Sequence, residues 1–347
     1  MPSSRDKGVL PRGGAPLALA VSAAVFGSFL VFQAAYGDEL RFLSIGTGAT
    51  NSTDFAIGGV IASVVSSPPG SRACDRGGSC GVPGLVAVAQ STQGSIENVT
   101  AVAEGAIDTA LVQADVLYWA YHGTGMFRET GSASGLRAIA NLFPATLQVV
   151  VRRDAGISKV KQLKGRRVSL GETGSGTLVT ARTILAAYGM TEADVEAQYL
   201  KPGPASDLLV DGEIDGFFVV GGVPAPAIGD VARRVPISLI PINGTTGEEL
   251  KSFYPFFTQA DVPAGSYPNV GHVESVGINT QWIISDRADP DFVYDLTRAL
   301  WHERSQTLFD NGHPEGRRIR LDTALQRIAI PLHSGAARFY EEQGVEK

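Results

Sequence analysis

The chain has 347 residues, of which 44% are hydrophobic, and a formal net charge of −6 at pH 7. This length allows a sizeable buried core and roughly two domains. The acidic balance excludes proteins whose main work is to bind nucleic acid or an anionic membrane surface. The five histidines are scattered along the chain and form no zinc-binding pattern, so we expect neither a metal nor a cofactor.

The first predicted element is a targeting segment, residues 1–37. Arg5, Lys7 and Arg12 form a basic start, residues 15–35 carry no charge, and residues 35–37 offer a small-x-small cleavage site. These features predict export to the periplasm with a signal peptide removed. The apolar stretch is long for a signal peptide, so an uncleaved membrane anchor is the alternative.

From residue 40 onward, short apolar runs alternate with amphipathic ones, which predicts an α/β fold with largely parallel sheets. The predicted strands are residues 40–45, 85–89, 107–112, 166–170, 195–200, 214–220 and 237–242. The predicted helices are residues 55–65, 96–103, a helix starting near 177, 205–210, 291–310 and 334–344.

The two cysteines, Cys74 and Cys80, are close together in the loop "GSRACDRGGSCG". A metal site would need more ligands than this loop offers. In an oxidising compartment we expect the two thiols to pair as a disulfide that holds the loop.

One unit occurs twice along the chain, in "VTAVAEGAIDTALVQ" (99–113) and "DLLVDGEIDGFFVV" (207–220). In each copy an apolar helix ends at an acid and a glycine, and an Ile-Asp pair then leads into an apolar strand. Glycine suits the left-handed position that ends a helix. The repetition predicts two lobes built on the same plan.

The segment "SLGETGSGTLVTARTILAAYG" (169–189) is typical of a strand, a glycine-rich turn and a helix. Its glycines Gly171 and Gly176 have the phosphate-loop spacing, but Thr177 stands where that loop requires lysine, so we exclude nucleotide triphosphates. Ser175 or Thr173 can cap the helix. The free N–H groups at a helix start, with hydroxyls beside them, suit a small anion such as a carboxylate.

Two α/β lobes place a cleft at the carboxyl ends of their strands. Five loops follow apolar runs and are rich in glycine and hydroxyl residues, so we expect them to bind a small polar ligand. These loops are 46–53, 90–95, 113–115, 171–177 and 221–224.

Five segments in order carry a resemblance to a known family: "IGTGATNSTDFAIGG", "STQGSIENVTAVAEGAIDTALVQADV", "LKGRRVSLGETGSGTLVTARTILAAYGM", "LLVDGEIDGFFVVGGVPAPAI" and "VPAGSYPNV". Together they resemble the TAXI family, the solute-binding subunits of TRAP transporters, over residues 38–345. The resemblance implies a monomeric periplasmic protein with the two-lobed type II periplasmic-binding fold and a ligand cleft between its lobes. It also implies a small carboxylate solute, such as a glutamate-like amino acid, and delivery to TRAP membrane permease subunits. It implies no enzymatic activity.

The same resemblance implies the lobes and the ligand-binding residues. Lobe 1 would comprise residues 38–145 and 248–347, and lobe 2 residues 146–247, with the chain crossing near 143–147 and 242–247. The implied ligand contacts are Thr47, Gly48, Ser95, Asn98 and Gln113 on the first lobe, Gly174, Ser175, Gly176 and Thr177 in the glycine-rich turn, Gly221, Gly222 and Pro224 on the second lobe, and Tyr267 from the returning chain.

Asp54 departs from the family pattern, which has an aromatic residue at its position. A carboxylate in the cleft would pair with the ammonium group of a ligand or repel a second carboxylate. We therefore include Asp54 among the ligand-binding residues, as a residue that selects against simple dicarboxylates. The alternative is that Asp54 only stabilises the start of the following helix.

Three other functions are weighed against transport by a TRAP system. Ser175 has no histidine near it in sequence, and no nucleophile elbow appears, so catalysis is disfavoured. A binding protein of an ABC importer would have the same two-lobed fold, and the sequence does not separate it from a TRAP subunit. A membrane-anchored ligand sensor requires that residues 1–37 remain attached.

Overall fold

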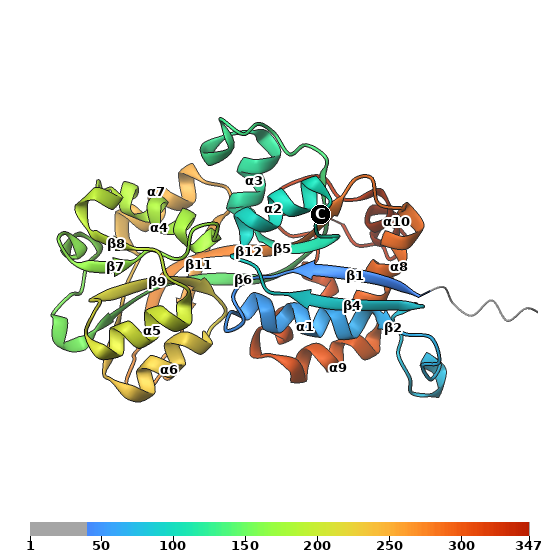
Figure 1. The fold of residues 1–347 in the computed structure, drawn as a ribbon, viewed down its shortest axis with the longest axis horizontal. Helices are drawn as coiled ribbons and strands as arrows, with labels where there is room; N and C mark the ends of the chain where they lie inside the picture. The colour runs from blue at the N-terminus through green and yellow to red at the C-terminus, as the bar shows by residue number, and fades with distance from the viewer. Residues whose placement is uncertain (1–39, 347) are drawn as a thin grey trace, which may run out of the picture. The chain divides into compact units, whose positions relative to one another are not determined.

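The computed structural model describes residues 40–346 (Figure 1), and these belong to one compact unit. The predicted targeting segment, residues 1–37, lies outside the described residues. No helix among residues 40–346 combines the length and the apolar character needed to cross a membrane.

One ten-stranded sheet runs through both lobes. Eight of its strands follow the order β4-β1-β5-β12-β6-β9-β7-β8, while β10 pairs with β6 and β11 pairs with β12. The bounds are β1 Arg41–Gly46, β4 Leu85–Gln90, β5 Thr109–Gln113, β6 Leu136–Arg152, β7 Arg167–Ser169, β8 Glu196–Gln198, β9 Gly216–Gly221, β10 Ile237–Ile240, β11 Phe257–Val262 and β12 Val273–Ser285. A separate two-stranded pair joins β2 (Ser66–Ser67) and β3 (Val82–Pro83).

Helices pack around this sheet in both lobes (Figure 1). The first lobe carries α1 Thr53–Val65, α2 Ser95–Glu104, α3 Ala114–His122, α8 Pro290–Leu300, α9 Glu303–Gly312 and α10 Ser334–Glu342. The second carries α4 Gly176–Ala187, α5 Pro202–Asp211, α6 Pro226–Arg234 and α7 Gly244–Phe253. The predicted two-lobed α/β architecture is confirmed.

The repeated sequence unit corresponds to a repeated structure. In both copies the helix ends at a glycine with positive φ, Gly105 at 78° and Gly212 at 73°. In both copies the aspartate directly before the strand accepts from the neighbouring strand. Asp108 Oδ2 accepts from the backbone N–H of Ser44 on β1, and Asp215 Oδ2 accepts from that of Arg167 on β7. The strand orders β4-β1-β5-β12 and β8-β7-β9-β6 are therefore equivalent.

The direction of the strands differs from the expectation of largely parallel sheets. β1 is parallel to β4 and β5, and β7 is parallel to β8 and β9, but all pairings of β6 and β12 are antiparallel. The expectation was wrong at the centre of the sheet because an apolar run shows that a strand is buried on both faces but not which way it points.

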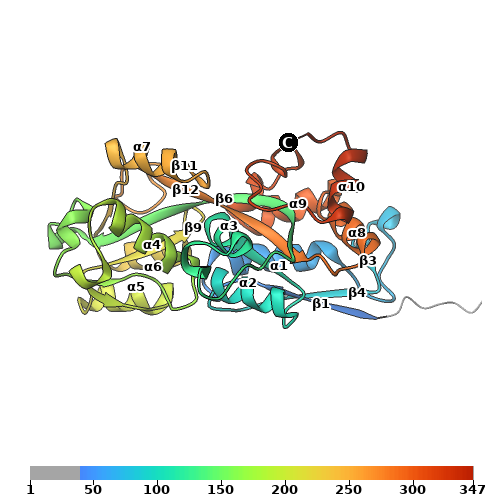
Figure 2. The same cartoon turned by 90° about the horizontal axis from the view of Figure 1, so that it is seen from above.

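The long strands β6 and β12 connect the lobes, as Figures 1 and 2 show. β6 pairs with β12 up to Thr146 and with β9 from Thr146 to Val151. β12 pairs with β11 up to Ile278 and with β5 from Thr280. A return crossing near residues 242–247, with residues 273–285 rejoining the first lobe, was expected. In the structure α7 starts at Gly244, and β11 follows it in the second lobe. We propose the return within residues 276–280 of β12.

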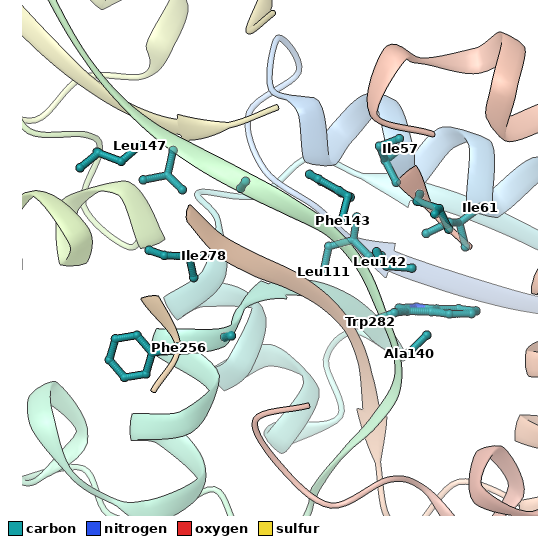
Figure 3. Packing of buried hydrophobic residues seen from close by; sticks show 14 of the residues in the cluster. Ile57, Ile61, Leu111, Ala140, Leu142, Phe143, Leu147, Phe256, Ile278 and Trp282 are labelled. Atoms are coloured by element: carbon teal, nitrogen blue, oxygen red, sulfur yellow. The ribbon is translucent and has the colours of Figure 1, made fainter. Parts of the chain in front are cut away.

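The largest buried cluster extends along β6 and β12 from one lobe to the other. Figure 3 shows Leu147 and Ile278 toward one end, Phe143 at the middle and Trp282 toward the other end, all within this cluster. Ile57 and Ile61 of α1 pack on the same core. The strands that connect the lobes are thus fixed by apolar packing as well as by hydrogen bonds.

The predicted disulfide is confirmed. Cys74 and Cys80 are joined with an S–S distance of 2.01 Å and close the loop between β2 and β3. The bond lies away from the ten-stranded sheet, so its role is local to that loop.

Candidate functional site

A cavity lies between the lobes at the carboxyl ends of β1, β5, β7 and β9, as the sequence analysis expected. It encloses about 660 Å³ of space between protein atoms, part of it open to solvent. Five helices begin at its wall: α1 at Thr53, α2 at Ser95, α4 at Gly176, α5 at Pro202 and α6 at Pro226. A helix start carries a partial positive charge and, where no proline stands there, unpaired N–H groups, so these positions can hold an anion although no basic side chain is among the described lining residues.

The start of α4 is the most complete of these anion-binding positions. Ser175 caps the helix by accepting from the backbone N–H of Leu178 at 3.1 Å, which leaves the N–H groups of Gly176 and Thr177 toward the helix start. The turn before it requires glycine because Gly171 has φ of 101° and Gly174 has φ of 91°. Thr177 Oγ1 accepts from the N–H of Val220 on β9 at 3.2 Å, which fixes the turn against the sheet.

Two carboxyl groups face the same cavity from opposite lobes. Asp54 lies in the first turn of α1 and Glu172 in the turn before α4, and the described lining residues include no lysine, arginine or histidine. Burial raises the pKa of Asp54 to about 7, against a lowering effect of the Thr280 hydroxyl. Burial likewise raises the pKa of Glu172 to about 7, although Lys201 lies 3.9 Å away.

Asp54 does not cap its helix. The cap of α1 is Ser52, whose hydroxyl accepts from the N–H of Phe55 at 3.2 Å. Part of Asp54 faces the cavity, but its Oδ1 is buried and has no hydrogen-bond partner among the described residues. A buried, unpaired carboxyl oxygen is costly unless it is protonated or a ligand completes it.

The predicted ligand contacts divide into two groups. Eight line the cavity: Gly48, Asp54, Ser95, Gln113, Ser175, Gly176, Thr177 and Gly221. They come from both lobes and from all five predicted loops, with Asp54 directly after the first of them, so the structure brings them together around one space.

Six predicted residues lie behind the cavity wall: Thr47, Asn98, Gly174, Gly222, Pro224 and Tyr267. Asn98 is fully buried and its Nδ2 donates to the carbonyls of Thr47 and Leu111, both at 2.8 Å. The carbonyl of Gly174 accepts from the N–H of Ile96 at 3.0 Å. These groups hold the loops in place, and we no longer propose them as direct ligand contacts.

Tyr267 and Gly222 also act through neighbours. The Tyr267 hydroxyl donates to Gln148 Oε1 at 2.5 Å and accepts from the N–H of Ala225 at 2.7 Å, so it fixes the start of α6. The N–H of Gly222 donates to Thr53 Oγ1 of the other lobe at 3.0 Å. Pro224 follows a cis peptide bond in the same turn.

Sequence reasoning missed several lining residues. Asn51, Gln93 and Glu172 add polar groups, while Leu200, Pro202, Phe218 and Pro226 add apolar walls. The polar ones stand inside loops that the sequence analysis had already chosen, so treating whole loops as candidates would have found them. The apolar ones follow β8, lie on β9 or start α6, and no sequence signal separates them from core residues.

The lobes are in contact around the cavity. Besides the bonds of Gly174 and Gly222, the N–H of Val223 donates to Glu315 Oε1 at 2.9 Å, and Glu315 belongs to the turn after α9. Val179 of α4 is 2% exposed and packs into the apolar cluster of the first lobe with Val99 and Leu117. The two lobes are therefore held together by hydrogen bonds and by apolar packing beside the cavity.

Comparison with known proteins gives a family and a fold. The model of the NMT1-like family matches residues 45–344. PhnD1 from Prochlorococcus marinus (MIT 9301), solved with methylphosphonate, is similar with a TM-score of 0.51 and 10% identity, covering 88% of this chain and 99% of that one. A protein from Bordetella bronchiseptica RB50 has a TM-score of 0.50 and 15% identity, covering 87% and 81%. The alkanesulfonate-binding protein SsuA from Xanthomonas axonopodis pv. citri, bound to MOPS, has a TM-score of 0.48 and 17% identity, covering 87% and 84%.

Proposed function

This chain belongs to the NMT1-like family, and from that premise we propose that it is an extracytoplasmic solute-binding protein that captures a small solute by lobe closure and delivers it to a membrane importer. The observation that carries the proposal is the cavity between two lobes, with helix starts and hydroxyl groups from both sides on its wall. Such proteins bind by shifting from an open to a closed form around the ligand. The proposal assigns binding and no catalysis.

Location outside the cytoplasm is supported by two features of this chain. Residues 1–37 have the composition of a targeting segment. The bond between Cys74 and Cys80 is of the kind that persists in oxidising compartments. If residues 1–37 stay attached, the protein would be held at the membrane surface, and the mass of the exported protein distinguishes the two forms.

The solute we propose carries one anionic group and at least one hydrogen-bond donor. The start of α4 with Ser175 and Thr177 is the position proposed for the anion, as the sequence analysis suggested for a carboxylate. Asp54 and Glu172 are the proposed partners of the donor, which in a glutamate-like amino acid would be the ammonium group. Because PhnD1 was solved with methylphosphonate, phosphonates are included beside carboxylates, and sulfonates are included as anions of the same tetrahedral shape.

The membrane partner we propose is an ABC-type importer, and the support for it is the match to the NMT1-like family together with the fold shared with PhnD1. The TAXI-like order of the five sequence segments favours TRAP permease subunits, and this is the second candidate. The two differ in their energy source. Uptake of the bound solute by membrane vesicles that carry the importer should require ATP in the first case. It should require only an ion gradient in the second.

The proposed function is tested by thermal unfolding of residues 38–347 with acidic and neutral amino acids, dicarboxylates, 2-oxoacids, phosphonates and sulfonates. A ligand at a hundred times its dissociation constant should add about 2.7 kcal/mol to the free energy of unfolding, a shift of several degrees. A shift with one class of anion identifies the solute chemistry. If ligand-free, folded protein shows no shift with any of these compounds, the proposal of an anionic solute is wrong.

Replacing Asp54 by asparagine tests the assignment of the donor. The change keeps the shape of the side chain but removes its negative charge, so an amino acid should bind roughly tenfold more weakly while the matching dicarboxylate binds equally or more tightly. Isothermal titration of both ligands gives the ratio. The matched control is Asp322→Asn, an exposed aspartate away from the cavity. Equal ratios in the variant and the wild type would mean that Asp54 does not select the solute.

A further inference from the structure

A buried carboxyl group lies where the two lobes meet, outside the ligand cavity. Asp115 is the second residue of α3 in the first lobe and is fully buried. Its Oδ1 accepts from the N–H of Val116 at 2.8 Å, and its Oδ2 accepts from the Thr180 hydroxyl on α4, in the second lobe, at 3.2 Å. Thr180 therefore gives this buried carboxyl group a direct contact from α4 of the other lobe.

The surroundings of Asp115 hold no compensating charge. The Thr180 hydroxyl has three acceptors within reach: the Gly176 carbonyl of its own helix at 3.1 Å, Asp115 Oδ2 at 3.2 Å and Gln113 Oε1 at 3.5 Å. Since Gln113 lines the ligand cavity, Asp115 and a residue of the cavity wall compete for the same donor. Charged side chains on the neighbouring elements are Glu97 and Glu104 on α2, His122 on α3, Arg182 on α4 and Glu274 on β12. None of them contributes to the pKa of Asp115, which burial raises to about 7 against the bonds from Val116 and Thr180.

From this geometry we infer that Asp115 is a proton-linked latch, ionised when the lobes are open and neutral when they close, so that closure takes up a proton at this carboxyl group. The inference rests on the proposed function in one respect, that the lobes open. On opening, α4 and Thr180 move away from α3, and water replaces them around the carboxyl group. The Thr180 hydroxyl then no longer supports Gln113 at the cavity wall, so the latch and the ligand site change together.

The direction of the pH effect follows from the two forms. In the closed form the pKa of Asp115 is about 7, and in the open form it approaches the ordinary value of 3.8. The extra stability of the closed form is therefore fully present below the lower value and is lost as the pH rises through 7. Between pH 5.5 and pH 8 the ratio of closed to open protein should fall about 30-fold from this group alone.

The test follows lobe closure in the ligand-free protein, so it does not depend on finding the solute. Cys74 and Cys80 are paired, so spin labels can be placed selectively on Glu129→Cys in the first lobe and Lys161→Cys in the second, both exposed. Pulsed electron resonance distances between the labels give the closed and open populations from pH 5.5 to pH 8. We expect the closed population to grow as the pH falls.

In Asp115→Asn the ratio of closed to open protein should no longer show the roughly 30-fold fall between pH 5.5 and pH 8, because the amide keeps the shape of the side chain and cannot ionise. Asp322→Asn, on an exposed aspartate, should leave it unchanged. Thr180→Val, which removes the only hydroxyl donor from the other lobe, should lower the closed population most at pH 8, where the ionised carboxylate needs that donor. A wild-type pH dependence in Asp115→Asn, or a closed population that does not change with pH in the wild type, would overturn the inference. Absence of any bound solute in the thermal screen would instead bear only on the proposed function.

Discussion

Replacing Gly222 by valine is expected to weaken solute binding roughly 100-fold or more, a loss of about 2.7 kcal/mol. A Cβ at this position would lie 2.3 Å from Glu315 Cγ and 3.0 Å from Thr53 Cγ2, and both of these atoms belong to the opposite lobe. A side chain there holds the lobes apart, and the apparent affinity for the solute falls in proportion to the smaller fraction of protein that can still close. Each lobe should fold normally, because the crowding arises only between them.

The matched control is Gly59→Val on α1, where a Cβ would meet no atom within 4 Å. Isothermal titration with the solute found by the thermal screen measures both variants, and unfolding of the ligand-free proteins shows whether they are folded. Wild-type affinity in Gly222→Val would show that closure at this point is not needed for binding. Weak solute binding in both variants would mean that replacing a glycine by valine lowers the affinity in itself, without any effect on the contact between the lobes.

Replacing Phe143 by alanine should lower the free energy of unfolding by about 3–5 kcal/mol, the largest stability effect we expect from a single change. Phe143 lies on β6 opposite Thr280 of β12 and is fully buried in the cluster that runs between the lobes (Figure 3). Removing its ring leaves a cavity that the paired strands on either side cannot collapse to fill.

The control for this change is Phe253→Ala, because Phe253 is 76% exposed at the end of α7. It should change the free energy of unfolding by less than about 0.5 kcal/mol. Urea unfolding of the wild type and the two variants gives the values. A loss below 1 kcal/mol for Phe143→Ala would mean that the strands between the lobes are not part of the cooperative core.

Much of the fold follows from local sequence patterns, because helix ends and buried strands have local causes. The repeated unit with Gly105 and Gly212 correctly indicated two similar lobes, since a left-handed helix end and a following apolar strand are set within a few residues. The directions of β6 and β12 could not be predicted in the same way. Their pairing depends on residues more than a hundred positions apart, such as Phe143 and Thr280.

The site shows the same division. The loops were found because glycine and hydroxyl residues after a strand have a physical reason to be there, and eight of the fourteen proposed contacts line one cavity. The sequence could not show which residues of these loops line the cavity and which are buried behind its wall. Thr47 and Asn98 are polar like the neighbouring residues that line the cavity, but both are buried behind its wall. Asp115 was included only as the last residue of the loop 113–115, and nothing in the sequence showed that Thr180 of α4 would contact it.

In the part of the chain that the structure describes, the two strands that run from one lobe to the other are β6 and β12, which are adjacent in one sheet. With these crossings, the second lobe is one continuous stretch of sequence inserted into the first, so its coding sequence could be exchanged as a unit. A chimaera that takes the second lobe from a relative needs to preserve the pairing of β6 and β12 at the two crossings to keep the lobes joined as they are here. Half of the ligand cavity, including the turn at α4, would be inherited as one piece, so new solute preferences can arise by a single recombination event.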